Sequence, residues 1–100
     1  MFVRVGTIRD VPIGGMRAFD VAGVKVTVAN ANGQLHAFED TCTHMGCSLA
    51  NGSLEGTTVT CACHGSQFDV TSGAVLRGPA ARPVRSRGVQ VQGQELLAET

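Results

Sequence analysis

Hydrophobic and polar positions alternate along this chain over short stretches that glycine, asparagine, aspartate and proline interrupt. Residues 24–29, VKVTVA, have valine at every second position, the period of two that is typical of a half-buried strand. Asn32-Gly33 follows, and this dipeptide favours a type I′ turn because both central positions of that turn need a positive φ. The chain is then expected to return along 34–38 as the second strand of a hairpin.

Other short apolar runs predict further strands, the last two joined as a hairpin about Gly93. These runs cover residues 2–8, 16–21, 57–61, 88–93 and 95–98. No stretch keeps a helical apolar period for more than two turns, and thirteen glycines divide the chain. The pattern therefore predicts an all-β, antiparallel fold, either a small sandwich or a small barrel.

The composition fits one small domain with a modest core. The chain has 100 residues, and its eight Lys plus Arg balance its eight Asp plus Glu. A zero net charge argues against a broad nucleic-acid footprint. No run is apolar over the length of a membrane span, and the first ten residues show no apolar leader. We therefore expect a soluble cytoplasmic protein that binds neither nucleic acid nor membrane.

The residues able to carry chemistry gather in two short windows. All four cysteines and two of the three histidines lie in 42–47, CTHMGC, and 61–68, CACHGSQF. By count alone, four cysteines allow two disulfides, one metal site or a mixture of both. A metal site is the better expectation for a cytoplasmic chain, because disulfides are disfavoured in that compartment.

The spacing within each window narrows the choice of metal. Cys42 and His44 form C-x-H, Cys61 and His64 form C-x-x-H, and sixteen residues separate the two pairs. Two thiolates and two imidazoles suit zinc or an iron–sulfur cluster. Zinc fingers usually pair like with like, whereas each window here supplies one cysteine and one histidine. This mixed pairing suits two irons, one held by both cysteines and the other by both histidines.

The sequence at this point resembles the Rieske proteins, whose [2Fe–2S] centre has two histidines in place of two cysteines on one iron. The match is C-x-H-x16-C-x-x-H, and it continues into RGPAARPV, which is similar to the family's third loop around Pro79. The resemblance implies one Rieske-type domain over 1–100, with a cluster-binding subdomain at about 40–80 formed mainly by two loops. The cluster ligands that it implies are Cys42, His44, Cys61 and His64.

The resemblance also bears on the residues between the ligands. Gly46 and Gly65 are small enough to let the two loops approach a bound inorganic group closely. Cys47 and Cys63 match the positions that carry a disulfide between the loops in quinol-oxidising relatives, although most small ferredoxins of oxygenase systems lack that pair. We expect the bridge on this ground, and two buried free thiols are the alternative.

Three further positions are expected to tune or shield the cluster. Ser66 matches a serine that, in high-potential relatives, donates its hydroxyl to a bridging sulfide. Phe68 stands where those relatives have a tyrosine whose hydroxyl reaches a ligand sulfur, so one hydrogen bond is missing. A midpoint potential between the quinol-oxidising proteins and the low-potential ferredoxins is therefore expected. Pro79 belongs to the loop that shields one side of the cluster in the family.

The resemblance implies an electron carrier and not an enzyme, because four ligands leave no open position on the irons. The chain looks like the soluble ferredoxins of multicomponent ring-hydroxylating systems. Those proteins take one electron from a flavin-dependent reductase and pass it to a terminal oxygenase. Two alternatives stay open: an electron-transfer subunit of another complex, such as a nitrite reductase small subunit or a quinol-oxidising complex, and a zinc-stabilised structural module.

Positive charge gathers near the C-terminal end of this motif, between Asp69 and Glu95, where no acid occurs. Such a run is expected either as a solvated loop and edge strand or as a docking patch for an acidic partner. The four arginines concerned are Arg77, Arg82, Arg85 and Arg87.

Overall fold

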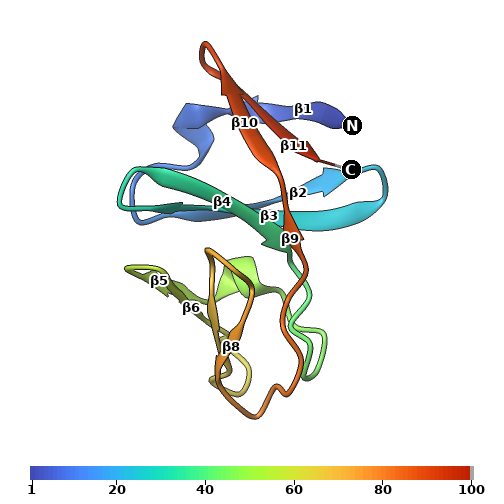
Figure 1. Cartoon of the computed structure of the whole chain (residues 1–100), viewed down its shortest axis with the longest axis vertical. Helices are drawn as coiled ribbons and strands as arrows, with labels where there is room; N and C mark the ends of the chain where they lie inside the picture. Colours follow the sequence, from blue (N-terminus) through green and yellow to red (C-terminus); the bar gives the residue numbers. More distant parts are fainter. Residues whose placement is uncertain (100) are drawn as a thin grey trace.

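A computed structural model describes residues 1–99, and their regular elements are β-strands and two short 3-10 helices. All strand pairs are antiparallel and form three sheets, with strand orders β1-β11-β10, β2-β3-β4-β9 and β5-β6-β7-β8 (Figure 1). The strands are β1 Phe2–Thr7, β2 Met16–Val21, β3 Val24–Ala31, β4 Gln34–Glu39, β5 Ser53–Glu55, β6 Thr58–Thr60, β7 Gln67–Asp69, β8 Val75–Arg77, β9 Ser86–Arg87, β10 Val89–Gln92 and β11 Glu95–Glu99. The 3-10 helices are η1 Ile8–Asp10 and η2 Leu49–Asn51. The predicted all-β, antiparallel fold is confirmed.

Every run predicted as a strand overlaps an observed strand, and the predicted turns at Asn32-Gly33 and Gly93 join strands as expected. Asn32 and Gly33 have φ values of 57° and 94° and connect β3 to β4. The sequence pattern does not predict β5, β7, β8 or β9, which are two or three residues long. These short strands depend on pairing with their neighbours in the sheet, which a local apolar pattern does not record.

The prediction that 24–29 form a half-buried strand is wrong from Val26 onward, because that part of β3 is covered on both faces, while Val24 and Lys25 are exposed. Val26 and Val28 pack into a core shared with β11, while Ala29 and Ala31 pack into a second core with the ligand-loop half of the chain. Thr27, which the alternation places toward water, is fully buried. Thr27 is tolerated there because its hydroxyl donates a hydrogen bond to the buried carboxylate of Asp40, the residue that follows β4.

The sheet β5-β6-β7-β8 lies below the other two in Figure 1, and three loops gather at its lower end. The first loop, 40–48, follows β4; the second, 61–66, joins β6 to β7; the third, 78–85, joins β8 to β9. Leu49, Val59 and Phe68 are fully buried in the core of this half of the chain. No helix within residues 1–99 has the length and apolar character needed to span a membrane.

Candidate metal centre

The first loop is a tight turn closed at both ends by backbone hydrogen bonds. The N–H of Cys42 donates to the carbonyl of Cys47 at 2.8 Å, and the N–H of Gly46 donates to the carbonyl of Cys42 at 2.8 Å. An isolated bridge between Thr41 and Ser48 closes the base of the turn. His44 lies within this turn, two residues after Cys42.

The second loop repeats the same backbone pattern. The N–H of Cys61 donates to the carbonyl of Ser66 at 2.8 Å, and the N–H of Gly65 donates to the carbonyl of Cys61 at 3.1 Å. Gly65 has a φ of 76°, and its counterpart Gly46 has a φ of 77°. Both positions lie in the left-handed region that glycine enters without a steric penalty. The two glycines are therefore needed for the shape of the turns, whereas their close approach to a bound group stays a prediction.

A buried carboxylate that the sequence pattern does not predict holds the base of the first loop. The side chain of Asp40 accepts hydrogen bonds from the hydroxyl of Thr27 on β3 and from the N–H of Ala50, the latter at 2.9 Å. The backbone carbonyl of Asp40 also accepts a hydrogen bond from the N–H of Leu49 at 2.8 Å. The only available signal was an acid placed directly before a cysteine loop, which is not specific.

The four expected ligands divide by burial into two pairs. Cys42 and Cys61 are free thiols with 3% and 2% of their surface exposed, whereas His44 and His64 are exposed. The two imidazole rings are neighbours in an edge-to-face arrangement, with centroids 5.0 Å apart and planes at 89°. Two turns from distant parts of the sequence thus place two thiols inside and two imidazoles outside.

A disulfide joins the remaining two cysteines, Cys47 and Cys63, and so links the first loop to the second. The sulfurs of Cys47, Cys61 and Cys63 all lie within 4.8 Å of one another, a spacing that a metal ion could bridge. This trio is not a ligand set, because two of its sulfurs are already bonded to each other and offer no thiolate. The short distances show instead that the bridge lies directly beside Cys61.

Burial raises the pKa of the Cys61 thiol above its ordinary value, and the neighbouring Cys42 acts in the same direction. Backbone N–H groups of Cys63 and His64 lower the pKa, because they stabilise the thiolate, but they do not outweigh burial. A bound metal cation reverses this balance, since coordination deprotonates a thiol outright. Two adjacent buried thiols are thus suited to a cationic centre.

The third loop is hydrogen-bonded to both ligand loops. The fully buried hydroxyl oxygen of Ser66 accepts a hydrogen bond from the N–H of Ala80 at 3.0 Å. The first loop is hydrogen-bonded to the third loop as well, because the hydroxyl of Thr43 donates to the backbone carbonyl of Arg82 at 2.6 Å. Pro79 lies in this loop and is exposed.

These residues fit a Rieske-type [2Fe–2S] cluster. The donor set is two thiols and two imidazoles, and the division into a buried pair and an exposed pair matches one iron held by sulfur and one held by nitrogen. A structural zinc site is less suited, because zinc fingers usually pair like ligands, whereas each turn here supplies one cysteine and one histidine.

The chain matches the Rieske [2Fe–2S] domain over residues 1–91 and belongs to that family. It is 32% identical over 90 residues to the ferredoxin component of biphenyl 2,3-dioxygenase from Rhodococcus jostii, covering 90% of this chain and 84% of that protein. Its structure is similar to the ferredoxin of carbazole 1,9a-dioxygenase from Nocardioides aromaticivorans, with a TM-score of 0.93, 33% identity and coverage of 99% and 97%. It is also similar to a chain in a complex of reduced oxygenase and oxidised ferredoxin of carbazole 1,9a-dioxygenase, with a TM-score of 0.92, 30% identity and coverage of 98% and 92%.

Proposed function

We propose that this protein is a one-electron carrier that passes electrons through a Rieske cluster to the terminal oxygenase of a ring-hydroxylating system. The observation that carries the proposal is the pair of matching turns, each of which holds one buried free thiol and one exposed imidazole. Relatives described as ferredoxin components of dioxygenases support the choice of system.

In this proposal Cys42 and Cys61 hold one iron of the cluster, and His44 and His64 hold the other. The cluster, when bound, supplies reversible one-electron chemistry. The two cysteines exclude water from the buried side, since almost none of their surface is exposed. The two histidines present their rings to solvent, so that a partner can come within short range of the site.

The partners proposed are a flavin-dependent reductase as donor and a terminal oxygenase as acceptor. The oxygenase is supported by the solved complex of a ferredoxin with its oxygenase in the carbazole system. The reductase is an inference from the resemblance of the sequence, and a cytoplasmic location is proposed alongside it. The protein itself acts as a carrier in this scheme, and the chemistry on the substrate belongs to the oxygenase.

Purified protein provides the test of the cofactor and the ligands. We expect two irons and two sulfides per chain, a reddish-brown colour and an EPR signal after reduction. His64→Ser is expected to abolish this signal, whereas His36→Ser, at a histidine on β4 outside the loops, is expected to retain it. A colourless protein containing zinc would overturn the cluster.

Reconstitution then tests the role in a pathway. The protein is added to the purified reductase and oxygenase components of the biphenyl system, and substrate-dependent oxygen uptake is measured. Uptake that requires this protein and saturates with its concentration supports the carrier. A protein that holds the cluster but supports no uptake with oxygenases of this class would overturn the acceptor and leave the cofactor in place.

A further inference from the structure

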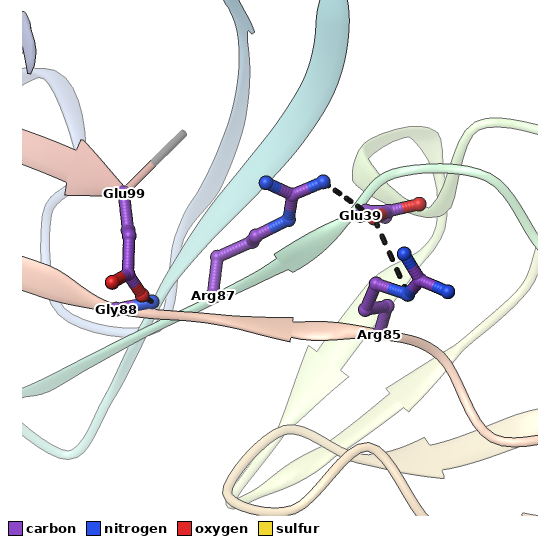
Figure 2. Close-up of polar contacts among 5 residues, drawn as sticks. All are labelled: Glu39, Arg85, Arg87, Gly88 and Glu99. Atoms are coloured by element: carbon purple, nitrogen blue, oxygen red, sulfur yellow. Dashed lines mark hydrogen bonds and ion pairs between the residues drawn. The ribbon is translucent and has the colours of Figure 1, made fainter. Parts of the chain in front are cut away.

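The four arginines between Asp69 and Glu95 do not form one group. Arg87 on β9 donates to the carboxylate of Glu39 on β4 at 2.6 Å, and only 17% of its side chain is exposed (Figure 2). Arg85 approaches the same carboxylate only to 3.8 Å and is 79% exposed. Because Glu39 is already neutralised by Arg87, the charge of Arg85 remains available to a partner.

The three other arginines lie at the end of the molecule that carries the ligand loops. Arg77 ends β8 and pairs in register with Gln67, the first residue after the second loop. Arg82 and Arg85 lie in the third loop. All three are exposed, and we call Arg77, Arg82 and Arg85 the arginine rim.

The acidic residues at this end of the chain are buried or already paired: Asp40 is buried and accepts from Thr27, and Glu39 is paired with Arg87. Residues 41–48, 61–67 and 76–86 contain neither aspartate nor glutamate. Glu55 and Asp69 belong to the same small sheet, but its antiparallel order puts them at the opposite end of the strands from the second loop. Hydrogen bonds from Thr71 hold the pKa of Asp69 below its usual range, so this acid is ionised at neutral pH, away from the rim.

The same end also has the composition of a protein-binding surface. Met45 beside His44 is 64% exposed, and Leu76 beside Arg77 is 53% exposed. Arginine and methionine are enriched in protein interfaces, whereas aspartate, glutamate and lysine are depleted. The only lysine of the chain, Lys25, lies in β3.

A groove of ≈ 850 Å³ runs between the first and third loops and gives the rim a shape to receive a partner. Its lining includes Thr41, Thr43 and Gly46 from the first loop and Arg82, Pro83, Val84 and Arg85 from the third. Glu39 lines it too, but its carboxylate is paired with Arg87. Cys42 also lines it, so a side chain seated in the groove would lie next to a proposed ligand. Two arginines line the groove, and the one acid there, Glu39, is already paired with Arg87, so a carboxylate is the favoured side chain of a partner.

We propose that the arginine rim is the docking surface for an acidic patch on the terminal oxygenase, with a carboxylate of that patch entering the groove. This inference rests on the proposed function, because it names the surface used in transfer to the oxygenase. The oxygenase is chosen over other partners because the chain is similar to a ferredoxin chain solved in complex with its oxygenase. Opposite charges at such a surface speed encounter and orient the partners.

The test measures electron transfer from the pre-reduced protein to purified oxygenase components of the biphenyl and carbazole systems by stopped-flow absorbance. The second-order rate constant is expected to fall about tenfold as ionic strength rises from about 0.01 M to about 0.5 M, because salt screens exposed charges. Arg77→Glu/Arg82→Glu is expected to lower the rate constant at low salt about tenfold. This variant leaves Glu39 and its two arginines intact.

The matched control is Arg9→Glu/Arg17→Glu, which changes the net charge equally. These two exposed arginines lie on η1 and β2, in a different part of the fold from the ligand loops. The control is expected to keep the rate constant within about twofold of wild type. An unchanged visible spectrum of each variant ensures that the cluster and fold are retained.

The outcomes separate the two proposals. Transfer that is insensitive to the rim reversal, or that the reversal accelerates, overturns the docking surface and leaves the proposed function standing. If the wild type reduces ferricyanide but none of these oxygenases, the proposed function fails, and the oxygenase as occupant of the rim fails with it. Transfer that the rim reversal slows and the control does not supports both.

Discussion

The N–H of Ala80 donates a hydrogen bond to the hydroxyl oxygen of Ser66, 3.0 Å away, and this contact fastens the third loop to the second. Both residues are buried, with 4% and 0% of their surface exposed. The serine oxygen is thus an acceptor toward the third loop, and its hydroxyl proton remains available for a second partner. One side chain thereby serves both the loop packing and the expected contact with the cluster.

Ser66→Ala is therefore expected to reduce stability and to lower the midpoint potential. The N–H of Ala80 loses its partner in a buried setting, at a cost of about 1–3 kcal/mol in the free energy of unfolding. Ser72→Ala is the control, because the exposed hydroxyl of Ser72 accepts from the N–H of Ala74 at 3.2 Å and water can replace it. Urea unfolding and voltammetry measure the two effects. Equal stability losses in both variants would contradict this account of Ser66.

Phe68→Tyr is expected to raise the midpoint potential. Phe68 is fully buried in the core beneath the ligand loops, and a tyrosine there would place one new hydroxyl near the proposed cluster. A hydrogen bond worth about 1 kcal/mol to the reduced state corresponds to about 40 mV for one electron. Phe38→Tyr adds the same hydroxyl to another fully buried phenylalanine of this core. Equal shifts in the two variants, or none, would rule out a specific bond from position 68.

Removal of the disulfide is expected to destabilise the ligand loops. The bridge between Cys47 and Cys63 spans a sequence separation of 16 residues. Loop-closure entropy for this length gives a loss of about 3 kcal/mol for Cys47→Ser/Cys63→Ser. Urea unfolding and the rate at which the visible colour bleaches on warming measure the change. A double variant as stable as the oxidised wild type would show that the two loops need no covalent link.

Arg87→Ala is expected to lower the free energy of unfolding by about 1–3 kcal/mol, because it leaves Glu39 mostly buried without its closest partner. Arg85→Ala removes the more distant arginine of the same carboxylate and is expected to cost less than about 0.5 kcal/mol, since that side chain is exposed. Denaturant unfolding of both variants at neutral pH measures the difference. Similar losses would mean that the carboxylate depends equally on both arginines.

Much of the site could be predicted from local sequence, because its chemistry is concentrated in two short windows. The spacings around Cys42 and Cys61 belong to turns whose shape is set by residues within six positions. The type I′ turn at Asn32-Gly33 is local in the same way. Resemblance to a known family supplied what spacing could not, above all the pairing expected for Cys47 and Cys63.

Features that depend on distant contacts could not be predicted. Asp40 has its role because Thr27 of another strand lies opposite it, and neither residue carries a local sign of that contact. The division of the arginines required the structure, since only the position of Glu39 separates the internal Arg87 from the exposed Arg85. Burial of β3 on both faces likewise depends on a sheet formed much later in the chain.

The double coverage of β3 limits how this protein can be reused in design. Ala29 and Ala31 belong to the core against which the sheet β5-β6-β7-β8 packs, and they lie on β3, outside residues 40–85. A fragment cut at those limits and transplanted onto another scaffold would expose its apolar underside to water. A successful graft therefore has to carry β3 and β4 along, or provide an equivalent two-strand platform in the host.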